Sequence, residues 1–251
     1  MPGSAVAVLL AAGRGTRLSS MAAPFSKPLL PVNGRPVVAY AAQAAVPFVD
    51  EIIVVAHPTT LAQVMAAVLE GIRSDPRPLI AAVQSEPRGV ADAIDVGLAE
   101  LTDDRPLVVL CGDNIVESQD VGTALNCVQR DDGGHSPIQL AWTYKEFEPR
   151  IARRFAVWSP GPSGRGMLVE KPAHPPSRVC WCGPLAFRSS NDVRRRIARL
   201  SPSARGEVEV TDLLNSFLLP GQARGFPLQG VWFDIGTPDS LREARRFMQR
   251  L

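Results

Sequence analysis

The sequence predicts an α/β fold built on a mostly parallel central sheet with helices on both faces. In the first 144 residues, short apolar runs rich in small and β-branched residues alternate with segments of helical hydrophobic period. The first of these runs leads into a glycine-rich turn, as a buried strand entering a loop does. Strands that alternate with helices pair in parallel, since each helix returns the chain to the same edge of the sheet.

Five apolar runs in this first part are the expected strands. They are Ala5–Leu10, Ile52–Ala56, Leu79–Val83, Leu107–Cys111 and Gln139–Tyr144. The helices expected between them are Pro36–Ala45, Leu61–Ile72, Val90–Leu101 and Val121–Arg130. Pro36 suits the first turn of its helix, and the hydroxyl of Thr59 or Thr60 can cap the helix that begins at Leu61. The resulting order of elements is Rossmann-like.

The regular alternation of strands and helices ends after Tyr144, where short apolar segments are separated by stretches rich in Pro, Gly and Ser. The expected strands of this part are Phe155–Trp158, Gly166–Glu170, Val179–Phe187 and Gly230–Phe233. The expected helices are Asp192–Leu200, Val210–Leu219 and Pro238–Arg250. A length of 251 residues suits one α/β unit, so we expect a single domain. No repeat of fixed period is present, which gives no support to a β-helix or solenoid extension.

Composition excludes several partner classes. A formal net charge of +2, from 27 basic and 25 acidic residues, lacks the basic surplus typical of nucleic-acid binding. The apolar run Ala5–Ala12 is too short to span a membrane. The four cysteines have no zinc-site spacing and suit a reducing compartment. We therefore expect a cytoplasmic protein without a nucleic-acid or membrane partner; a homo-oligomer is compatible with the sequence, but no pattern demands one.

The segment from Leu10 to Leu18 is the first candidate for ligand binding. It follows the first expected strand, where open α/β sheets place their ligand loops, and its small residues allow the backbone to approach a phosphate chain. Arg17 supplies a charged donor for phosphate, and Lys27 adds a second cation beyond the loop. The pattern therefore favours a phosphate-bearing ligand.

Two other phosphate-binding motifs fail in this segment. A dinucleotide fingerprint needs Gly or Ala where Leu18 stands, and no acidic residue ends the second strand, so a nicotinamide-dependent oxidoreductase is disfavoured. A Walker A loop needs Gly-Lys-Ser or Gly-Lys-Thr, which the chain lacks.

Two aspartates each follow an apolar strand. Asp113 comes after Leu107–Cys111, and Asp234 comes after Val231–Phe233. Carboxylates at strand ends can meet at one edge of a sheet, and one or two carboxylates with phosphate oxygens and water are the usual ligands of Mg²⁺. We expect Mg²⁺ as cofactor, with Asp113 and Asp234 as its protein ligands.

Several motifs together resemble one family. Leu-Ala-Ala-Gly-Arg-Gly-Thr-Arg-Leu from Leu10 onward and Ser-Lys-Pro-Leu-Leu-Pro-Val around Lys27 resemble the signature of sugar-nucleotide pyrophosphorylases, also called sugar-1-phosphate nucleotidyltransferases. The likeness continues in order through Gln84–Ala91, Leu110–Ile115, Val169–Pro172, Arg205–Asp212 and Trp232–Thr237. It covers nearly the whole chain and is most similar to the glucose-1-phosphate thymidylyltransferases.

The resemblance implies roles for individual residues. Residues 1–144 would mainly bind the nucleotide, and residues 145–251 would form an inserted sugar-binding β region that mainly binds the sugar phosphate. Arg17, Lys27 and Asp113 would be catalytic, and Asp113 and Asp234 would hold the metal. The implied nucleotide contacts are Leu10, Ala12, Gly13, Gly15, Thr16, Gln84 and Gly89, with Gln84 and Gly89 at the base. The implied sugar-phosphate contacts are Ala156, Glu170, Lys171, Trp181 and Arg205.

The implied reaction joins a nucleoside triphosphate, dTTP or UTP, to a hexose-1-phosphate and releases pyrophosphate. A sugar-phosphate oxygen would attack the α-phosphorus in line. No protein nucleophile or general base is required, because the second pKa of a phosphate monoester is about 6 and its oxygens are already ionised at neutral pH.

Two departures from the family pattern lie on the acceptor side. Phe155-Ala156-Val157 stands where the family often has Tyr-Gly-Val, and Trp181 places an indole near residues that resemble sugar contacts. Because of these departures, an acceptor other than a hexose-1-phosphate stays an alternative, such as a cyclitol phosphate, a phosphocholine-like alcohol phosphate or a phosphonate. A non-catalytic nucleotide-sugar-binding subunit is the alternative of another class. The retained reactive residues Arg17, Lys27, Asp113, Lys171 and Asp234 disfavour it.

Overall fold

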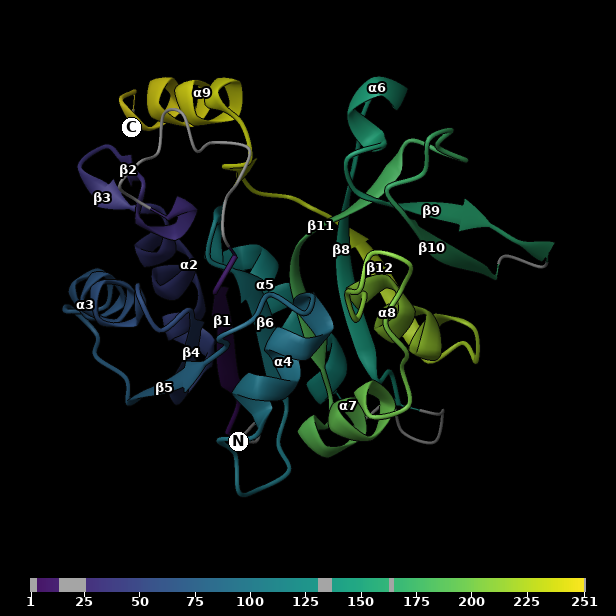
Figure 1. Ribbon diagram of the computed structural model, residues 1–251, viewed down its shortest axis with the longest axis horizontal. Helices are drawn as coiled ribbons and strands as arrows, with labels where there is room; N and C mark the ends of the chain where they lie inside the picture. Colours follow the sequence, from purple (N-terminus) through teal and green to yellow (C-terminus); the bar gives the residue numbers. More distant parts are fainter. Residues whose placement is uncertain (1–3, 14–25, 131–136, 163–164, 251) are drawn as a thin grey trace.

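The parallel half of the central sheet forms the frame of the molecule. The computed structural model describes residues 4–13, 26–130, 137–162 and 165–250 (Figure 1). Strands β1 (Val6–Ala11), β4 (Glu51–Ala56), β5 (Leu79–Val83) and β6 (Leu107–Cys111) pair in parallel in the order β6-β1-β4-β5. Their carboxyl ends therefore share one edge, the upper edge in Figure 1.

The sheet continues from β6 into an antiparallel half. Strand β11 (Val179–Phe187) pairs antiparallel with β6, and then with β8 (Leu140–Glu146) and β9 (Ala156–Pro160). Strand β10 (Gly166–Glu170) pairs with β9, and β12 (Ala223–Pro227) runs parallel to β8. Within the described residues, nine strands thus form one mixed sheet, which passes through both halves of the chain without a break.

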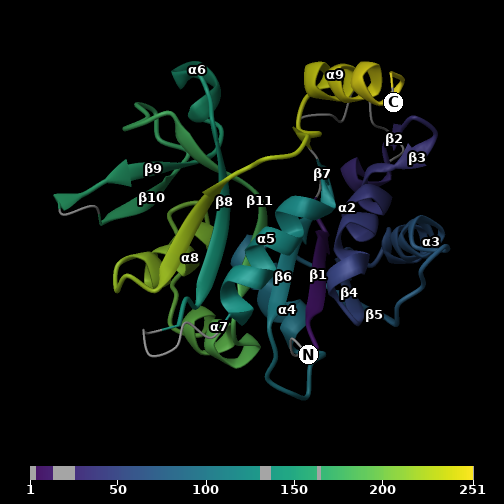
Figure 2. The same cartoon turned by 180° about the vertical axis from the view of Figure 1, so that it is seen from behind.

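Helices cover both faces of this sheet. Helices α2 (Val37–Ala45), α3 (Leu61–Gly71) and α5 (Ser118–Gln129) pack on one face with Ala7, Leu9 and Ala11 of β1. Helices α4 (Val90–Leu98), α7 (Ser190–Ile197) and α8 (Val210–Leu218) pack on the other face with Val6 and Val8. Alternate residues of β1 thus enter opposite cores. Helix α4 lies in front of the sheet in Figure 1, and α5 lies in front in the reverse view of Figure 2. The predicted α/β class is confirmed.

Short elements gather at the carboxyl edge. They are η2 (Lys27–Leu29), β2 (Pro31–Val32), β3 (Arg35–Pro36), β7 (Asn114–Val116), α6 (Pro149–Ala152), β13 (Trp232–Asp234) and α9 (Pro238–Met248). The short η3 (Val46–Phe48) lies instead at the amino edge, between the end of α2 and the start of β4. A small third core, which includes Val32, Ile115, Ile235 and Leu241 of α9, packs α9 against the carboxyl edge. It holds the end of the chain against the edge where the strands finish.

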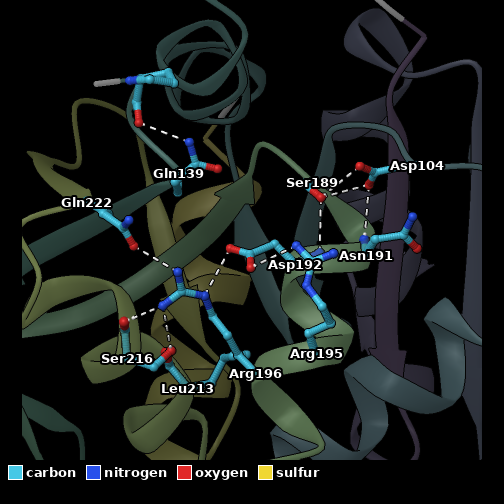
Figure 3. A network of polar contacts seen from close by, with 11 residues as sticks. Asp104, Gln139, Ser189, Asn191, Asp192, Arg195, Arg196, Leu213, Ser216 and Gln222 are labelled. Atoms are coloured by element: carbon cyan, nitrogen blue, oxygen red, sulfur yellow. Dashed lines mark hydrogen bonds and ion pairs between the residues drawn. The ribbon is translucent and has the colours of Figure 1, made fainter. Parts of the chain in front are cut away.

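A polar network joins α7 to its neighbours on the antiparallel side (Figure 3). Ser189 caps α7 by accepting from the Asp192 amide, and its hydroxyl donates to Asp104 (2.8 Å). Arg196 donates to Asp192 (2.9 Å) and to Gln222 (2.8 Å), and also contacts the Ser216 carbonyl of α8. The network fixes α7 and α8 relative to each other and to the start of β12.

The expected helix starts were partly wrong. Pro36 ends β3 and precedes α2, so it is not in the first turn of that helix. Thr60 is the residue before α3, but its side chain does not cap the helix and instead donates to the carbonyl of His57. None of the described helices is long and apolar enough to cross a membrane.

Candidate active site

Two adjoining cavities lie at the carboxyl edge of the parallel strands. The first has a volume of about 410 Å³ and is lined from β1, α4 and the turn before α4. The second, of about 340 Å³, is lined from β9, β10, β11 and the β13 segment. Their common wall consists of Lys27, Val90, Cys111, Asp113 and Glu207. Two ligands bound side by side would meet at this wall.

The first cavity collects the described part of the predicted nucleotide set. Its lining includes Leu10, Ala12, Gly13, Gln84 and Gly89. The other members of the predicted set on this side, Gly15, Thr16 and Arg17, lie outside the described residues.

Gly89 closes one side of this first cavity. Its φ is +111°, and a Cβ there would lie 2.4 Å from the carbonyl oxygen of Val208. Only glycine fits this approach without a backbone shift. The Val208 amide donates to Arg88 O (2.7 Å), and Val208 O accepts from the Ala91 amide (3.2 Å), so residue 208 is fixed across the start of α4.

The second cavity collects most of the predicted sugar-phosphate set. Ala156, Glu170, Lys171 and Trp181 line it. Lys171 Nζ lies 2.7 Å from Glu170 Oε1, and the Lys171 backbone has a φ of +41°, which is uncommon for a residue with a side chain. The described structure therefore places a cation and a carboxylate in the same cavity wall.

Arg205 is arranged differently from the other predicted sugar-phosphate residues. It does not line either of the two cavities described above, and its guanidinium donates to both carboxylate oxygens of Glu209 (2.8 and 2.7 Å) and to Glu170 (3.3 Å). Hydrogen bonding to Glu209 raises the pKa of Arg205 despite its partial burial. In this structure Arg205 supports two carboxylates that line the second cavity.

A pair of short strands brings the two predicted metal ligands together. Strand β13 pairs antiparallel with β7, with Asp234 opposite Asn114, and the Ile235 amide donates to Asp113 O (2.9 Å). A Cβ at residue 236 would lie 2.6 Å from Asp234 Oδ2, so glycine at this position leaves room for the carboxylate. Both Asp113 and Asp234 line the second cavity, as expected from their positions at strand ends.

Cations and amides surround the two carboxylates. Lys27 Nζ lies 3.4 Å from Asp113 Oδ2, and Asn114 Nδ2 donates to Asp113 Oδ1 (3.1 Å). Asn114 is fixed in turn because its Oδ1 accepts from Trp232 Nε1 (3.1 Å). Arg154 Nη2 lies 3.7 Å from Asp234 Oδ2. These contacts hold the carboxylates at the cavity wall and balance part of their charge.

The nearby thiols are not activated. Burial raises the pKa of Cys111, and the negative charges of Asp113 and Asp234 raise it further. Burial also raises the pKa of Cys182, with Cys180 and Asp234 contributing. Because a thiolate is the nucleophilic form, these protonated thiols do not suit covalent catalysis.

The carboxylates fit a hard divalent cation held jointly with a ligand. Among the described residues, no group of three or more His, Cys, Asp or Glu side chains forms a metal site by itself. Two aspartates in one cavity nevertheless match Mg²⁺, which usually takes one or two protein carboxylates together with phosphate oxygens and water.

Several residues of the site were missed as individuals by sequence reasoning. Glu207 and Glu209 line the second cavity from the motif after Arg205, and Trp232 lines it from the motif around Asp234. The sequence signal that could have identified them is their position inside two motifs that resemble the family. Arg154, which bridges to Asp234, carried no such signal.

The family follows from the match of the chain to a family model. Residues 6–250 match the model described as nucleotidyl transferase. The chain belongs to the nucleotidyl transferase family. The predicted resemblance is therefore confirmed, over nearly the whole length of this nucleotidyl transferase.

Curated relatives agree with the assignment. This nucleotidyl transferase is 32% identical to a glucose-1-phosphate thymidylyltransferase of Streptomyces griseus, over 96% of its own length and 65% of that protein's length. It is also 32% identical to a glucose-1-phosphate thymidylyltransferase of Neisseria meningitidis, over 96% of this chain and 82% of that one.

Solved structures share its fold. One from Bacillus anthracis, provisionally described as a glucose-1-phosphate thymidylyltransferase in complex with sucrose, superposes with a TM-score of 0.83 at 24% identity, covering 99% of this chain and 96% of that one. A UDP-glucose pyrophosphorylase complexed with UDP-glucose gives a TM-score of 0.77 at 17% identity, with 99% of both chains covered. At these identities the likeness concerns the fold.

Proposed function

We propose that this protein transfers a nucleotidyl group from a nucleoside triphosphate, dTTP or UTP, to a hexose-1-phosphate in a Mg²⁺-dependent reaction. The products are a nucleoside-diphosphate sugar and pyrophosphate. The observation that carries the proposal is the wall shared by the two cavities, in which Lys27 and Asp113 lie in contact. A triphosphate in the first cavity and a sugar phosphate in the second would place their reacting atoms at these two side chains.

The chemistry requires positioning and charge rather than a protein nucleophile. A sugar-phosphate oxygen attacks the α-phosphorus, the bond to the β-phosphate oxygen breaks, and pyrophosphate leaves with the electron pair. The attacking phosphate is already ionised at neutral pH, so the reaction needs no general base and no nucleophilic thiol such as Cys111, whose pKa is raised by burial. When bound by Asp113 and Asp234, Mg²⁺ supplies positive charge to the phosphate oxygens.

The residues of the chain have separate tasks in this proposal. Lys27 stabilises negative charge on the reacting phosphate, and Arg17 holds the leaving pyrophosphate. Lys171 pairs with the acceptor phosphate, and Glu170 accepts hydrogen bonds from the sugar hydroxyls. Arg205 keeps Glu170 and Glu209 in place.

The lining of the second cavity supports a second candidate acceptor. Phe155, Ala156 and Trp181 all line it, and Trp181 Nε1 is a buried donor without a partner among the described residues. The candidates are a cyclitol phosphate, a phosphocholine-like alcohol phosphate and a phosphonate. The phosphorus group of such an acceptor would use the same contacts as that of a hexose phosphate, and the rest of the molecule would contact Phe155, Ala156 and Trp181.

The test measures pyrophosphate release with each nucleoside triphosphate crossed against a panel of sugar, cyclitol and alcohol phosphates and phosphonates. Release that needs Mg²⁺ and an acceptor, and that Asp113→Asn abolishes, supports the transferase. The matched control is Asp50→Asn, because Asp50 is an exposed aspartate outside both cavities. Binding of nucleotide sugars without release in any pairing would contradict catalysis and support the binding-only subunit.

A further inference from the structure

Strand β10 lies at an edge of the central sheet. Among the described residues it pairs with β9 and with no other strand, in a register that places Leu168 opposite Trp158 and Glu170 opposite Ala156. An edge strand leaves one row of backbone N–H and C=O groups without a strand partner. Leu168 is nevertheless buried, with 1% of its surface exposed. Its backbone groups that face away from β9 therefore need partners from elsewhere in the chain.

The side-chain amide of Asn215 supplies both partners. Asn215 Oδ1 accepts from the Leu168 amide (2.7 Å), and Asn215 Nδ2 donates to the Leu168 carbonyl oxygen (2.9 Å). Two such bonds to one residue are what a neighbouring antiparallel strand would make. Asn215 belongs to α8, which lies next to β10 (Figures 1 and 2), and it is buried, with 8% of its surface exposed. Helix α8 is thus joined to the backbone of β10 at Leu168.

Only one orientation of the Asn215 amide satisfies both backbone groups. A backbone N–H only donates, and a backbone C=O only accepts. Rotating the amide by half a turn would bring donor against donor and acceptor against acceptor, and all four groups would be unpaired in a buried place. An apolar side chain of similar shape can make neither bond. The attachment of β10 to α8 at this point therefore depends on the amide group of residue 215.

The attached residue lies two positions before Glu170. Side chains alternate along a strand, so those of Leu168 and Glu170 leave β10 on the same face. The Leu168 side chain belongs to the same core as Val210 and Leu214 of α8. The Glu170 side chain lines the second cavity. Holding the backbone at Leu168 therefore sets where the Glu170 carboxylate enters that cavity.

Arg205 makes a second contact between β10 and the segment before α8. Its guanidinium lies 3.3 Å from Glu170 Oε1, and the Arg205 side chain is 41% exposed. The two bonds between Asn215 and Leu168 are shorter and are buried. A buried hydrogen bond is stronger than one that competes with water. Asn215 is therefore the firmer of these two anchors of β10.

We propose that Asn215 is a positioning residue that sets the place of the Glu170 carboxylate in the second cavity, and through it the recognition of hydroxyl groups on the acceptor. The inference rests on the proposed function and deepens it, because it adds a determinant of acceptor binding outside the cavity wall. Asn215 lines neither of the two cavities, so it acts through β10 rather than by contact with a substrate.

Asn215→Leu is the main test, because leucine is similar in shape to asparagine and makes neither bond. The rate of pyrophosphate release gives kcat and the KM values for the best acceptor and for the nucleotide. The acceptor KM is expected to rise by about tenfold, and the nucleotide KM to stay within about twofold of wild type. Asn215→Gln keeps an amide and is expected to hold the acceptor KM within about threefold of wild type. Asn215→Ala carries the test if Asn215→Leu does not fold.

A double-mutant cycle with Glu170→Gln separates positioning from a general loss of stability. If Asn215 acts through Glu170, adding Asn215→Leu to Glu170→Gln is expected to change the acceptor KM by no more than about twofold. The matched control is Arg196→Met, which removes hydrogen bonds that join α7 to α8 and to the start of β12. Its acceptor KM is expected to stay within about twofold of wild type, even where urea unfolding shows a loss of stability similar to that of Asn215→Leu.

The outcomes distinguish this inference from the proposed function. An unchanged acceptor KM in Asn215→Leu, equal rises in the acceptor and nucleotide KM, or effects that multiply in the cycle would overturn the role of Asn215 while leaving a nucleotidyltransferase. Failure of the wild-type protein to release pyrophosphate in any pairing would overturn both. A rise confined to the acceptor, absent when Glu170→Gln is already present and largely reversed in Asn215→Gln, supports the inference.

Discussion

Lys27 Nζ lies 3.4 Å from Asp113 Oδ2 in the wall between the two cavities, and both side chains are partly buried, at 18% and 27% exposure. This contact joins the end of β6 to a short turn that follows the glycine-rich segment by only a few residues in sequence. The lysine is therefore held where a phosphate bound at Asp113 would meet it, before any ligand arrives.

Lys27→Met is expected to lower kcat for pyrophosphate release by about 100-fold or more, because the developing charge on the transferred phosphate loses a fixed cation. Steady-state kinetics with saturating nucleotide and acceptor measure the effect. Lys145→Met is the matched control, since Lys145 is one of the three lysines and lines neither cavity. Equal rates for Lys27→Met and wild type would remove Lys27 from the reaction.

Asp234→Asn is expected to raise the Mg²⁺ concentration that gives half-maximal activity by at least about tenfold, because one of two carboxylate ligands becomes neutral. The measurement is a Mg²⁺ titration at fixed substrate concentrations. Asp239→Asn serves as control, since that side chain is 87% exposed. An unchanged Mg²⁺ requirement would exclude Asp234 as a ligand.

Glu209→Gln is expected to destabilise the fold in a pH-dependent manner. Burial opposes the ionisation of Glu209, but hydrogen bonds from Arg205 and Ser203 outweigh it, so its pKa lies below the ordinary value of 4.5. Because the folded-state pKa is the lower one, the stabilisation is complete above the ordinary value and is lost as pH falls through the lowered pKa.

Urea unfolding at pH 7 should give a free energy of unfolding about 1–3 kcal/mol lower for Glu209→Gln than for wild type. The difference should shrink below pH 4.5, the ordinary value. Glu207→Gln is the control, since its carboxylate is 43% exposed and 3.5 Å from Arg205, and an effect within about 0.5 kcal/mol is expected. A difference that does not vary between pH 7 and pH 3 would contradict the role of the ion pair.

Trp181→Phe is expected to change acceptor selectivity with little loss of stability. The indole N–H is buried without a partner in the described chain, so its removal relieves an unpaired donor while an aromatic ring remains. We expect the free energy of unfolding to fall by no more than about 1 kcal/mol. The KM for the acceptor should shift severalfold, and the KM for the nucleotide should stay constant. Trp158→Phe, in the neighbouring strand and outside the cavity, is the control; an altered nucleotide KM with an unaltered acceptor KM would contradict the placement.

The strongest elements were predicted closely from hydrophobic pattern. Leu79–Val83 and Leu107–Cys111 are strands with the expected bounds, because each is a compact apolar run between turns. Strand β12 was missed because Ala223–Pro227 contains Gly and Pro and has no apolar alternation. It forms because it pairs with the free edge of β8. Such pairing depends on the tertiary structure and cannot be predicted from the local sequence pattern.

Many of the residues that line the two cavities could be named from the sequence, but their contacts could not. Asp113 and Asp234 were expected to meet because both follow strands, and they line one cavity as expected. The pairing of β7 with β13 that brings them together joins short segments 118 residues apart at Asn114 and Trp232, so no local signal announces it. For the same reason, the hydrogen bonds from Arg205 to Glu209 could not be predicted from the sequence and are seen only in the structure. The individual roles in binding and catalysis stay predictions.

Strand β11 changes partners along its length. Leu185–Phe187 pair with β6 of the parallel half, whereas Cys180 pairs with β9, and the register against β8 shifts between Trp181 and Leu185. Gly183 lies in this irregular stretch with a φ of +74°, and Thr143 Oγ1 donates to Pro184 O (3.1 Å). The parallel half of the sheet and the β9–β10 pair are thus joined through a local change of register in β11. Under the proposed function, we expect that exchanging the β9–β10 hairpin and the first half of β11 for those of a relative would retarget the acceptor, provided that Ala156 and Leu168 keep their packing in the core they share with Val6 and Val8.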